Sequence, residues 1–484
     1  MNDFLAGAGL LVAAGASAAA ILLPPGRTRS LAMVVAIALF PTLILGDQWH
    51  TAQIVDLRHD GGRIVALVAV AAVAIGVLAY LFRRWPLLLP LAIVAALPFR
   101  IPLHAGGDTA NLLVPLYLVI AAGVVVTALR DRKASPAGRS SFWLTRLLAA
   151  VVVLYALQTL YSEDFSKGLQ NVCFFLVPFT VAFALLREVE WERKLLTLVL
   201  CVVGAEAAVF VLIGSVEYVT RSLFWNDQVI RSNEFHTYFR VNSVFWDPNV
   251  YGRYLALVIT VATAALLWTR ERRSFALLAI LIAFLWLGLA QTFSQSSYIA
   301  LLAGLAVLAA IRWSPKWTLA AVAVGVVGAF VAVVFAGGKP ELGRINIDTS
   351  GRANLVSGGV ELFAERPLQG YGSGSFQDAY REHRENKDVP VSESHTEPVT
   401  VAAEQGLIGL AVYIALIVVA LWTMTAGIRG PPTLLAARAA VLAAFVALLV
   451  HSLAYAGFFE DPITWVLLAI GVSLAPSPAI RDSA

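Results

Sequence analysis

Long apolar segments recur along the whole chain, and they constrain its fold more than any other feature. Runs of about 17 to 22 residues are common among them, enough for a helix to cross the roughly 30 Å hydrocarbon core of a bilayer. The composition agrees, because only 14% of the 484 residues are charged, against roughly 25% in soluble domains. Helices satisfy their own backbone hydrogen bonds in lipid. We therefore predict an all-α polytopic membrane protein with about 13–15 transmembrane helices.

The spans can be assigned from these segments. They are predicted at about residues 4–23, 31–46, 64–82, 86–98, 112–129, 144–160, 171–186, 195–214, 249–268, 275–291, 297–311, 317–336, 400–424, 436–456 and 462–475. Three of them are short, which is why the helix number is given as a range. We expect residues 1–484 to form a single membrane domain.

Lys and Arg residues are concentrated in one of the two alternating sets of loops. That set holds nineteen of them, whereas the short loops of the opposite set hold Arg58, Arg63, Arg100 and Lys167. Basic residues in short loops stay in the cytoplasm, so the first set is predicted to be cytoplasmic. The opposite set includes a first long external loop at 215–248 and a second at 337–399. Chemistry outside lacks ATP and sugar nucleotides, which favours a lipid-linked substrate.

The second long loop contains a predicted short helix with a positive charge at its start. In DTSGRANLVSGGVELFAERPLQGYGSGSF (348–376), Arg352 falls in the first turn and Pro367 ends the helix. A cation there opposes the helix dipole, and a bound phosphate shared by the guanidinium and the free amides would resolve the conflict. The alternative is a surface arginine paired with Glu361 or Glu365.

The first long loop runs into an apolar span through HTYFRVNSVFWDPNVYGRYLAL (236–257), in which Arg240 and Arg253 flank several aromatic residues. The aromatics suit a membrane interface, and the plainer interpretation is an aromatic belt with each arginine snorkelling to lipid headgroups. We favour that interpretation for Arg253 and leave Arg240 open.

His395 lies among small polar and acidic residues just before an apolar span. An imidazole with a pKa near neutrality can deprotonate a hydroxyl, and Glu393 or Glu397 could orient it or raise its pKa. The alternative is a surface histidine without a role. Metal-ligand spacing such as HExxH is absent, so no metal site is predicted. Glu206, inside a predicted span, is either functional or paired within the protein.

Several of these stretches, in order, resemble the O-antigen ligase and polymerase superfamily. The ligase signature of a His, a small polar residue, nine residues and Gly-x-x-Gly is matched by His395, Thr396, Gly406 and Gly409. SGRANLVSGGVELFAERPLQGYGSGSF is similar to the Ser-Gly-Arg helix of the family, and RVNSVFWDPNVYGRYLAL to its Arg followed by Pro-Asn. The motifs cover residues 236–410. Thr396, Asp247 and Gln295 depart from the residues usual at their positions, and Gln295 replaces an arginine.

The resemblance implies a GT-C-like membrane glycosyltransferase in the bacterial cytoplasmic (inner) membrane. It would transfer an oligo- or polysaccharide from undecaprenyl diphosphate to a glycan or glycolipid acceptor at the extracytoplasmic face, with inversion and without metal or other cofactor. Arg240 and Arg352 would hold the diphosphate, and His395 would act on the acceptor hydroxyl. Possible supporting residues are Glu404, Glu393, Asp247 and Arg253.

Two other functions are kept as alternatives. A polysaccharide polymerase would use the same donor, with the end of another lipid-linked repeat as acceptor. A transporter or lipid flippase is more distant, with Glu206 as its coupling residue, because inverted repeats and interrupted helices at matching positions are absent from the sequence. No nucleic-acid partner is expected.

Overall fold

The computed structural model describes residues 3–105, 108–129, 142–224, 226–235, 238–324, 352–383, 394–428, 430 and 432–475. Within them the protein is a helical bundle, apart from a hairpin of two short antiparallel strands, β1 (Ile101–Ala105) and β2 (Asp108–Leu112). Eleven helices of the described part are long and apolar enough to cross a membrane, and the shorter apolar helices Val114–Ala128 and Pro462–Leu474 accompany them. The chain is therefore a polytopic membrane protein, as predicted.

The helices of the N-terminal half are α1 (Asp3–Leu22), α2 (Arg27–Asp47), α3 (Ala52–His59), α4 (Gly61–Arg84), α5 (Leu88–Ala96), α6 (Val114–Ala128), α7 (Phe142–Thr159), α8 (Phe165–Asn171), the π-helical turn η2 (Val172–Leu176), α9 (Val177–Leu186) and α10 (Arg193–Thr220). The predicted span at 86–98 is thus only the nine-residue α5. The predicted span at 317–336 begins in helical residues, but most of it lies outside the described part.

The remaining helices are α11 (Asp227–Phe235), α12 (Pro248–Trp268), α13 (Arg272–Thr292), α14 (Gln295–Arg312), α17 (Arg352–Glu365), α18 (Phe376–His383), α19 (Glu397–Ile428), the 3-10 turn η3 (Pro432–Leu434), α20 (Leu435–Ser452) and α21 (Pro462–Leu474). The predicted helix after residue 348 is confirmed as α17, with Arg352 in its first turn.

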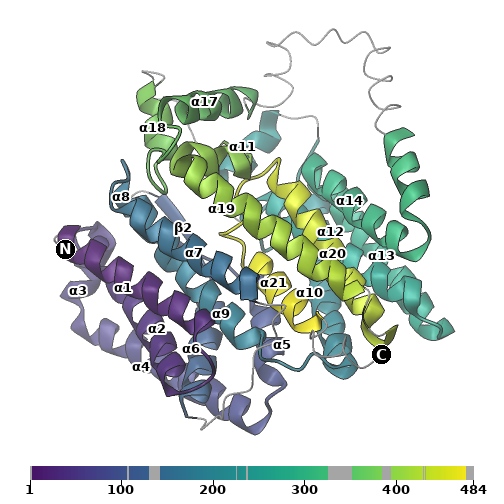
Figure 1. The fold of residues 1–484 in the computed structure, drawn as a ribbon, viewed down its shortest axis with the longest axis horizontal. Coiled ribbons are helices and arrows are strands. Elements are labelled where there is room, and N and C mark those ends of the chain that lie inside the picture. Colours follow the sequence, from purple (N-terminus) through teal and green to yellow (C-terminus); the bar gives the residue numbers. More distant parts are fainter. Residues whose placement is uncertain are drawn as a thin grey trace.

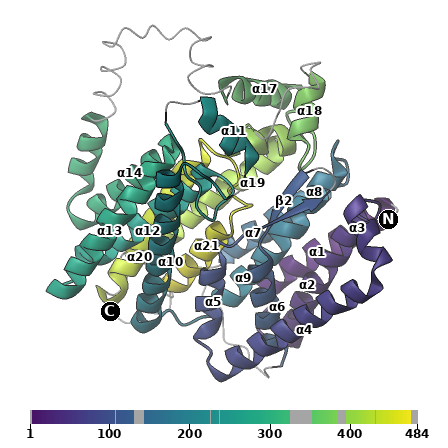
Figure 2. The ribbon, with the colours of Figure 1, turned by 180° about the vertical axis from the view of Figure 1, so that it is seen from behind.

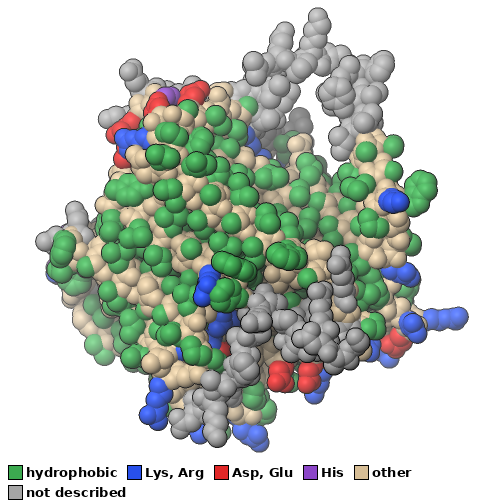
Figure 3. All heavy atoms as spheres, viewed as in Figure 1, with side chains coloured by type: hydrophobic (Ala, Val, Ile, Leu, Met, Phe, Trp, Pro, Cys, Tyr) green, Lys and Arg blue, Asp and Glu red, His purple; other side chains and the backbone are tan. Residues whose placement is uncertain are grey.

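The bundle has two groups of helices joined by the C-terminal ones. Helices α1, α2, α6, α7 and α9 pack around one apolar core, and α10, α12, α13 and α14 around another. Helices α19 and α21 pack against the first group and α20 packs against the second, and these three helices contact one another between the two groups in Figures 1 and 2. Apolar side chains on α4, α13 and α14 remain exposed, as expected for helix faces that contact lipid. Figure 3 shows this apolar surface across the middle of the molecule.

The two ends of the bundle differ. Short helices α11, α17 and α18 lie together at one end, at the top of Figure 1. At the other end, buried or half-buried arginine side chains donate to carbonyl oxygens at helix C-termini: Arg29 to Ala20 and Ala184, Arg187 to Ile21, and Arg438 to Leu474. Cations are favourable there because the helix dipole is negative at its C-terminus. Many Lys and Arg side chains gather along this end in Figure 3.

Helix α19 is broken at Gly406, whose φ of 64° and ψ of −162° interrupt the helical backbone. The segment between α17 and α18 docks against the break: the amide of Leu407 donates to the carbonyl oxygen of Pro367, and the carbonyl oxygens of Ala403 and Glu404 accept from the amides of Tyr371 and Gly372. Gln158 of α7 donates to the carbonyl oxygen of Gln405. The break can therefore be buried, because the backbone groups named above, which lie beside it, all have hydrogen-bond partners.

Candidate functional site

The first candidate residue, Arg240, precedes α12 and is held by three groups without charge. Its Nε donates to the Thr292 carbonyl oxygen at 2.9 Å, and its Nη2 donates to Asn249 Oδ1 at 3.0 Å. Asn233 of α11 binds both the amide and the carbonyl of Arg240. The guanidinium is therefore fixed in direction while its positive charge stays available.

Arg352 and His395 lie close to Arg240, although sequence separates them widely. Burial lowers the pKa of Arg240 most, and the charge of Arg352 lowers it further, whereas the carboxylate of Asp247 raises it. The pKa of His395 is also lowered by burial and by Arg352, with Asp247 opposing. Arg352 Nη1 lies 3.5 Å from the Ala454 carbonyl oxygen. The three residues predicted to carry the chemistry thus share one electrostatic environment at the end of the bundle that holds α17.

His395 has a left-handed backbone conformation, with φ at 61°. Non-glycine residues rarely adopt it, and such strain persists only where neighbouring structure enforces it. Here Ser394 Oγ bonds to Thr400 Oγ1 at 2.7 Å and accepts from the Thr396 amide, while Thr396 Oγ1 donates to the Leu453 carbonyl oxygen. These bonds tie the turn to α19 and to the end of α20, so the imidazole direction is set by the fold.

Arg253 corrects one interpretation made from sequence. It does not snorkel to the surface: its side chain is 5% exposed and pairs with Asp461 through Nη2 and Oδ2 at 2.8 Å. The other oxygen of Asp461 caps α21 by accepting from the Ile463 amide. Arg253 was expected at the interface because aromatic residues surround it in sequence, but a partner two hundred residues away removes it from lipid.

Tyr455 lies among these residues, and the sequence analysis did not identify it as a candidate. Its ring lies 6.2 Å from the ring of His395, 5.9 Å from the ring of His451 and 5.9 Å from the guanidinium carbon of Arg253. His451, inside the apolar helix α20, is fully buried. A histidine in an otherwise apolar span was the sequence signal that could have indicated this part of the site.

The proposed supporting residues divide into two groups. Asp247 lies near the candidate residues: it caps α12 by accepting from the Asn249 amide at 2.6 Å, and its charge acts on both Arg240 and His395. Glu404 instead accepts from the amides of Gly374 and Phe376 and so fixes the loop before α18. Glu393 lies outside the described residues.

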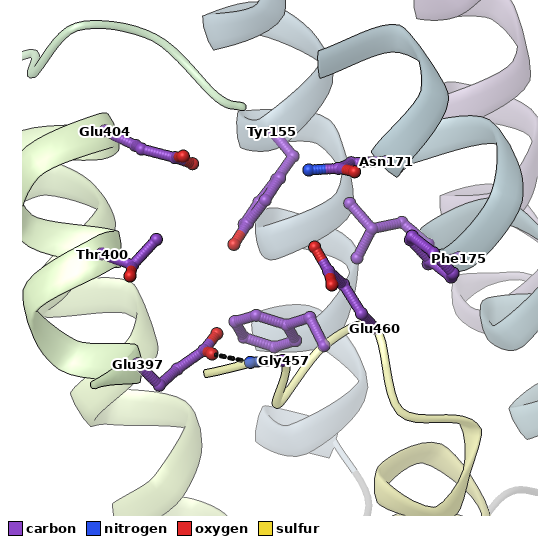
Figure 4. A pocket seen from close by; sticks show the side chains of 10 residues that line it. Tyr155, Asn171, Phe175, Glu397, Thr400, Glu404, Gly457 and Glu460 are labelled. Carbon is purple, nitrogen blue, oxygen red and sulfur yellow. Dashed lines mark hydrogen bonds between the residues drawn. The ribbon is translucent and has the colours of Figure 1, made fainter. Parts of the chain in front are cut away.

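Glu404 and Glu397 line a separate polar pocket with Thr400, Tyr155 and Glu460 (Figure 4). Glu397 Oε2 accepts from the amides of Gly457 and Phe458 at 2.7 and 3.0 Å, which anchors the loop that follows α20. From the sequence, Glu397 was a residue that could orient His395, but its described hydrogen bonds are to this loop.

Glu206 accepts a hydrogen bond from Tyr254 at 3.3 Å. This internal partner agrees with the second of the two interpretations given for Glu206, that it is paired within the protein.

A comparison with known families bears on this arrangement. The family model described as O-antigen ligase matches residues 280–414, which include Arg352 and His395 and leave Arg240 just outside. No curated protein matches the chain significantly. The match covers the C-terminal part of α13, α14, α17, α18 and the broken part of α19, and over this range the chain is similar to the O-antigen ligase family.

Proposed function

We propose that the protein is a membrane glycosyltransferase that moves an oligo- or polysaccharide from undecaprenyl diphosphate to an acceptor hydroxyl at the extracytoplasmic face. The observation that carries this proposal is the convergence of Arg240, Arg352 and His395 from three distant segments. The family match supports the general type of enzyme, and the chemistry of the three side chains supports the donor and the roles.

The two arginines suit a diphosphate. Among the described residues neither Arg240 nor Arg352 forms an ion pair with a carboxylate, whereas Arg29, Arg253 and Arg366 each do. Carbonyl and amide oxygens orient the guanidiniums of Arg240 and Arg352 without cancelling their charge. Negative charge grows on the diphosphate as its bond to the anomeric carbon breaks, and two fixed cations would stabilise that charge in the transition state.

His395 suits the acceptor. Its lowered pKa keeps the imidazole neutral at neutral pH, and a neutral imidazole can accept a proton. In the proposed step the acceptor oxygen attacks the anomeric carbon and its proton passes to His395. The bonding electrons between the anomeric carbon and the diphosphate leave with undecaprenyl diphosphate, so a single displacement inverts the anomeric centre.

The side of the membrane follows from the two ends of the bundle. The arginine-rich end suits the cytoplasm, and this supports an extracytoplasmic position for the opposite end, with α17 and the candidate site. Under this proposal 215–248 and 337–399 are external loops of a single membrane domain. Donor molecules there have already crossed the bilayer attached to lipid.

A product assay tests the proposal. Purified protein in nanodiscs receives an undecaprenyl diphosphate-linked glycan and candidate acceptors, with a His395→Ala sample beside it. A single transfer to a distinct acceptor, reduced by about 10²-fold or more in the variant, is expected for a ligase with a general base. A ladder of products from the donor alone would instead identify a polymerase. Equal activity of the wild type and His395→Ala would remove His395 from the mechanism.

A further inference from the structure

The guanidinium of Arg240 lies at one end of a hydrogen-bond network whose other members are buried. Asn249 Oδ1 accepts from Arg240 Nη2 at 3.0 Å and from Ser294 Oγ at 2.9 Å. Asn249 and Ser294 are themselves buried. One amide oxygen at the start of α12 therefore holds the arginine and is in turn held by a hydroxyl just before α14.

The network continues inward to a histidine. Ser294 Oγ lies 2.8 Å from Ser297 Oγ and 3.2 Å from Ser296 Oγ. His451 Nε2 lies 3.2 Å from Ser296 Oγ and 3.4 Å from Ser297 Oγ. The imidazole comes from α20, which packs against both α12 and α14. A chain of polar groups thus connects the interior of the bundle to Arg240.

Counting hydrogen atoms gives this network a direction. An amide oxygen has no hydrogen, so Ser294 must donate its only one to Asn249. The contacts of Ser294 with Ser296 and Ser297 then require those two hydroxyls to donate to Ser294. Each serine has one hydroxyl hydrogen, and that of Ser297 also has the Asn249 carbonyl oxygen 3.5 Å away. Both contacts with His451 therefore need a hydrogen on Nε2, which the neutral imidazole protonated at Nε2 supplies.

We infer that His451 is a positioning residue that orients the Asn249 amide toward Arg240. With His451 donating, the serines donate outward and Asn249 must present its oxygen. Without that donor the chain can reverse, and the Asn249 amide can turn its NH₂ group toward the guanidinium. The arginine would then lose an acceptor and face two donors instead. For diphosphate binding, this inference rests on the role proposed for Arg240.

Binding of undecaprenyl diphosphate without a glycan, measured in nanodiscs, tests the inference apart from turnover. His451→Met removes the donor and is expected to weaken binding about tenfold, the size of a lost hydrogen bond to a charged group. His451→Gln keeps an NH₂ donor and is expected to bind nearly as well as the wild type. In an Arg240→Ala background, His451→Met is expected to add nothing, because the group that the network orients is gone.

The outcomes separate the two proposals. Wild-type binding by His451→Met, or an equal further loss in the Arg240→Ala background, overturns the positioning role and leaves the proposed function standing. Wild-type binding by Arg240→Ala overturns both. The tautomer has its own readout: imidazole ¹⁵N resonances, with that of His451 identified by its absence in His451→Gln, are expected to show a hydrogen on Nε2. A hydrogen on Nδ1 contradicts the network direction.

Discussion

At the scale of single residues, Arg240 and His395 are affected by the charges of the same two neighbours, Arg352 and Asp247. Arg352 disfavours a proton on His395, whereas the carboxylate of Asp247 favours one, and burial adds to the effect of the arginine. The same neighbours act on Arg240. Under the proposed roles, the protonation of His395 is controlled by residues that bind, or help to arrange, the other substrate.

This arrangement predicts the pH dependence of the proposed reaction. A base must be unprotonated, so kcat/KM is expected to rise with pH to a plateau, with its midpoint below the ordinary histidine value of 6.5. Arg352→Gln removes a neighbouring positive charge and is expected to raise the midpoint, and Asp247→Asn to lower it. Initial rates across pH measure both shifts. Midpoints that stay in place in both variants would contradict the role of His395 as the base.

At the scale of the helix, the Gly-x-x-Gly part of the signature has a structural cause. Gly406 has a positive φ, and a Cβ there would lie 2.3 Å from the Leu368 carbonyl oxygen. A Cβ on Gly409 would lie 2.2 Å from the Cβ of Gln405, so the second glycine leaves room for the side chain at the break. The two glycines let α17 and α19 dock, and both helices start beside the site.

Replacing Gly406 by alanine is expected to destabilise the protein, although alanine has a higher helix propensity than glycine. Gly406→Ala places a side chain in a positive-φ conformation that is essentially confined to glycine, at a cost of roughly 1–3 kcal/mol, before any backbone clash. We expect a lower thermal midpoint and reduced transfer activity. Gly76→Ala is the matched control, because nothing lies within 4 Å of its added Cβ in α4. The thermal unfolding midpoint and the transfer activity of both variants are measured in nanodiscs and compared. Equal stability of the two variants would show that the break is not required.

At the scale of the whole molecule, the ends of the bundle are chemically distinct. Helix α13 shows the distance between them: the Thr292 carbonyl near its C-terminus binds Arg240, while its N-terminus begins with Arg272 and Arg273. Twenty residues of helix separate these points, roughly 30 Å. A site at one end and basic residues at the other fit a protein that receives its substrate after the substrate has crossed the membrane.

Labelling by a membrane-impermeant maleimide tests this orientation. In a background with Cys201 replaced by Ala, a cysteine at exposed Ser357 in α17 is expected to react in intact spheroplasts. A cysteine at exposed Arg273 is expected to react only after lysis. Mass spectrometry of the purified protein gives the extent of reaction. The reverse pattern would assign the candidate site to the cytoplasm.

The sequence by itself determined the membrane class, most of the spans and the helix that starts at Arg352, because these depend on local composition and periodicity. It also indicated Arg240, Arg352 and His395 through a resemblance carried by short motifs. These properties need no knowledge of which segments meet.

Only the tertiary structure decided how those residues are supported. The Arg253–Asp461 pair, the contact of Tyr455 with His395 and the hydrogen bonds between His451 and the serines all join segments distant in sequence. The role of Glu404 was decided in the same way, since the amides that donate to its carboxylate lie in the loop before α18 and at the start of that helix. Buried polar groups take partners wherever packing brings them, so their pairing is a property of the folded bundle.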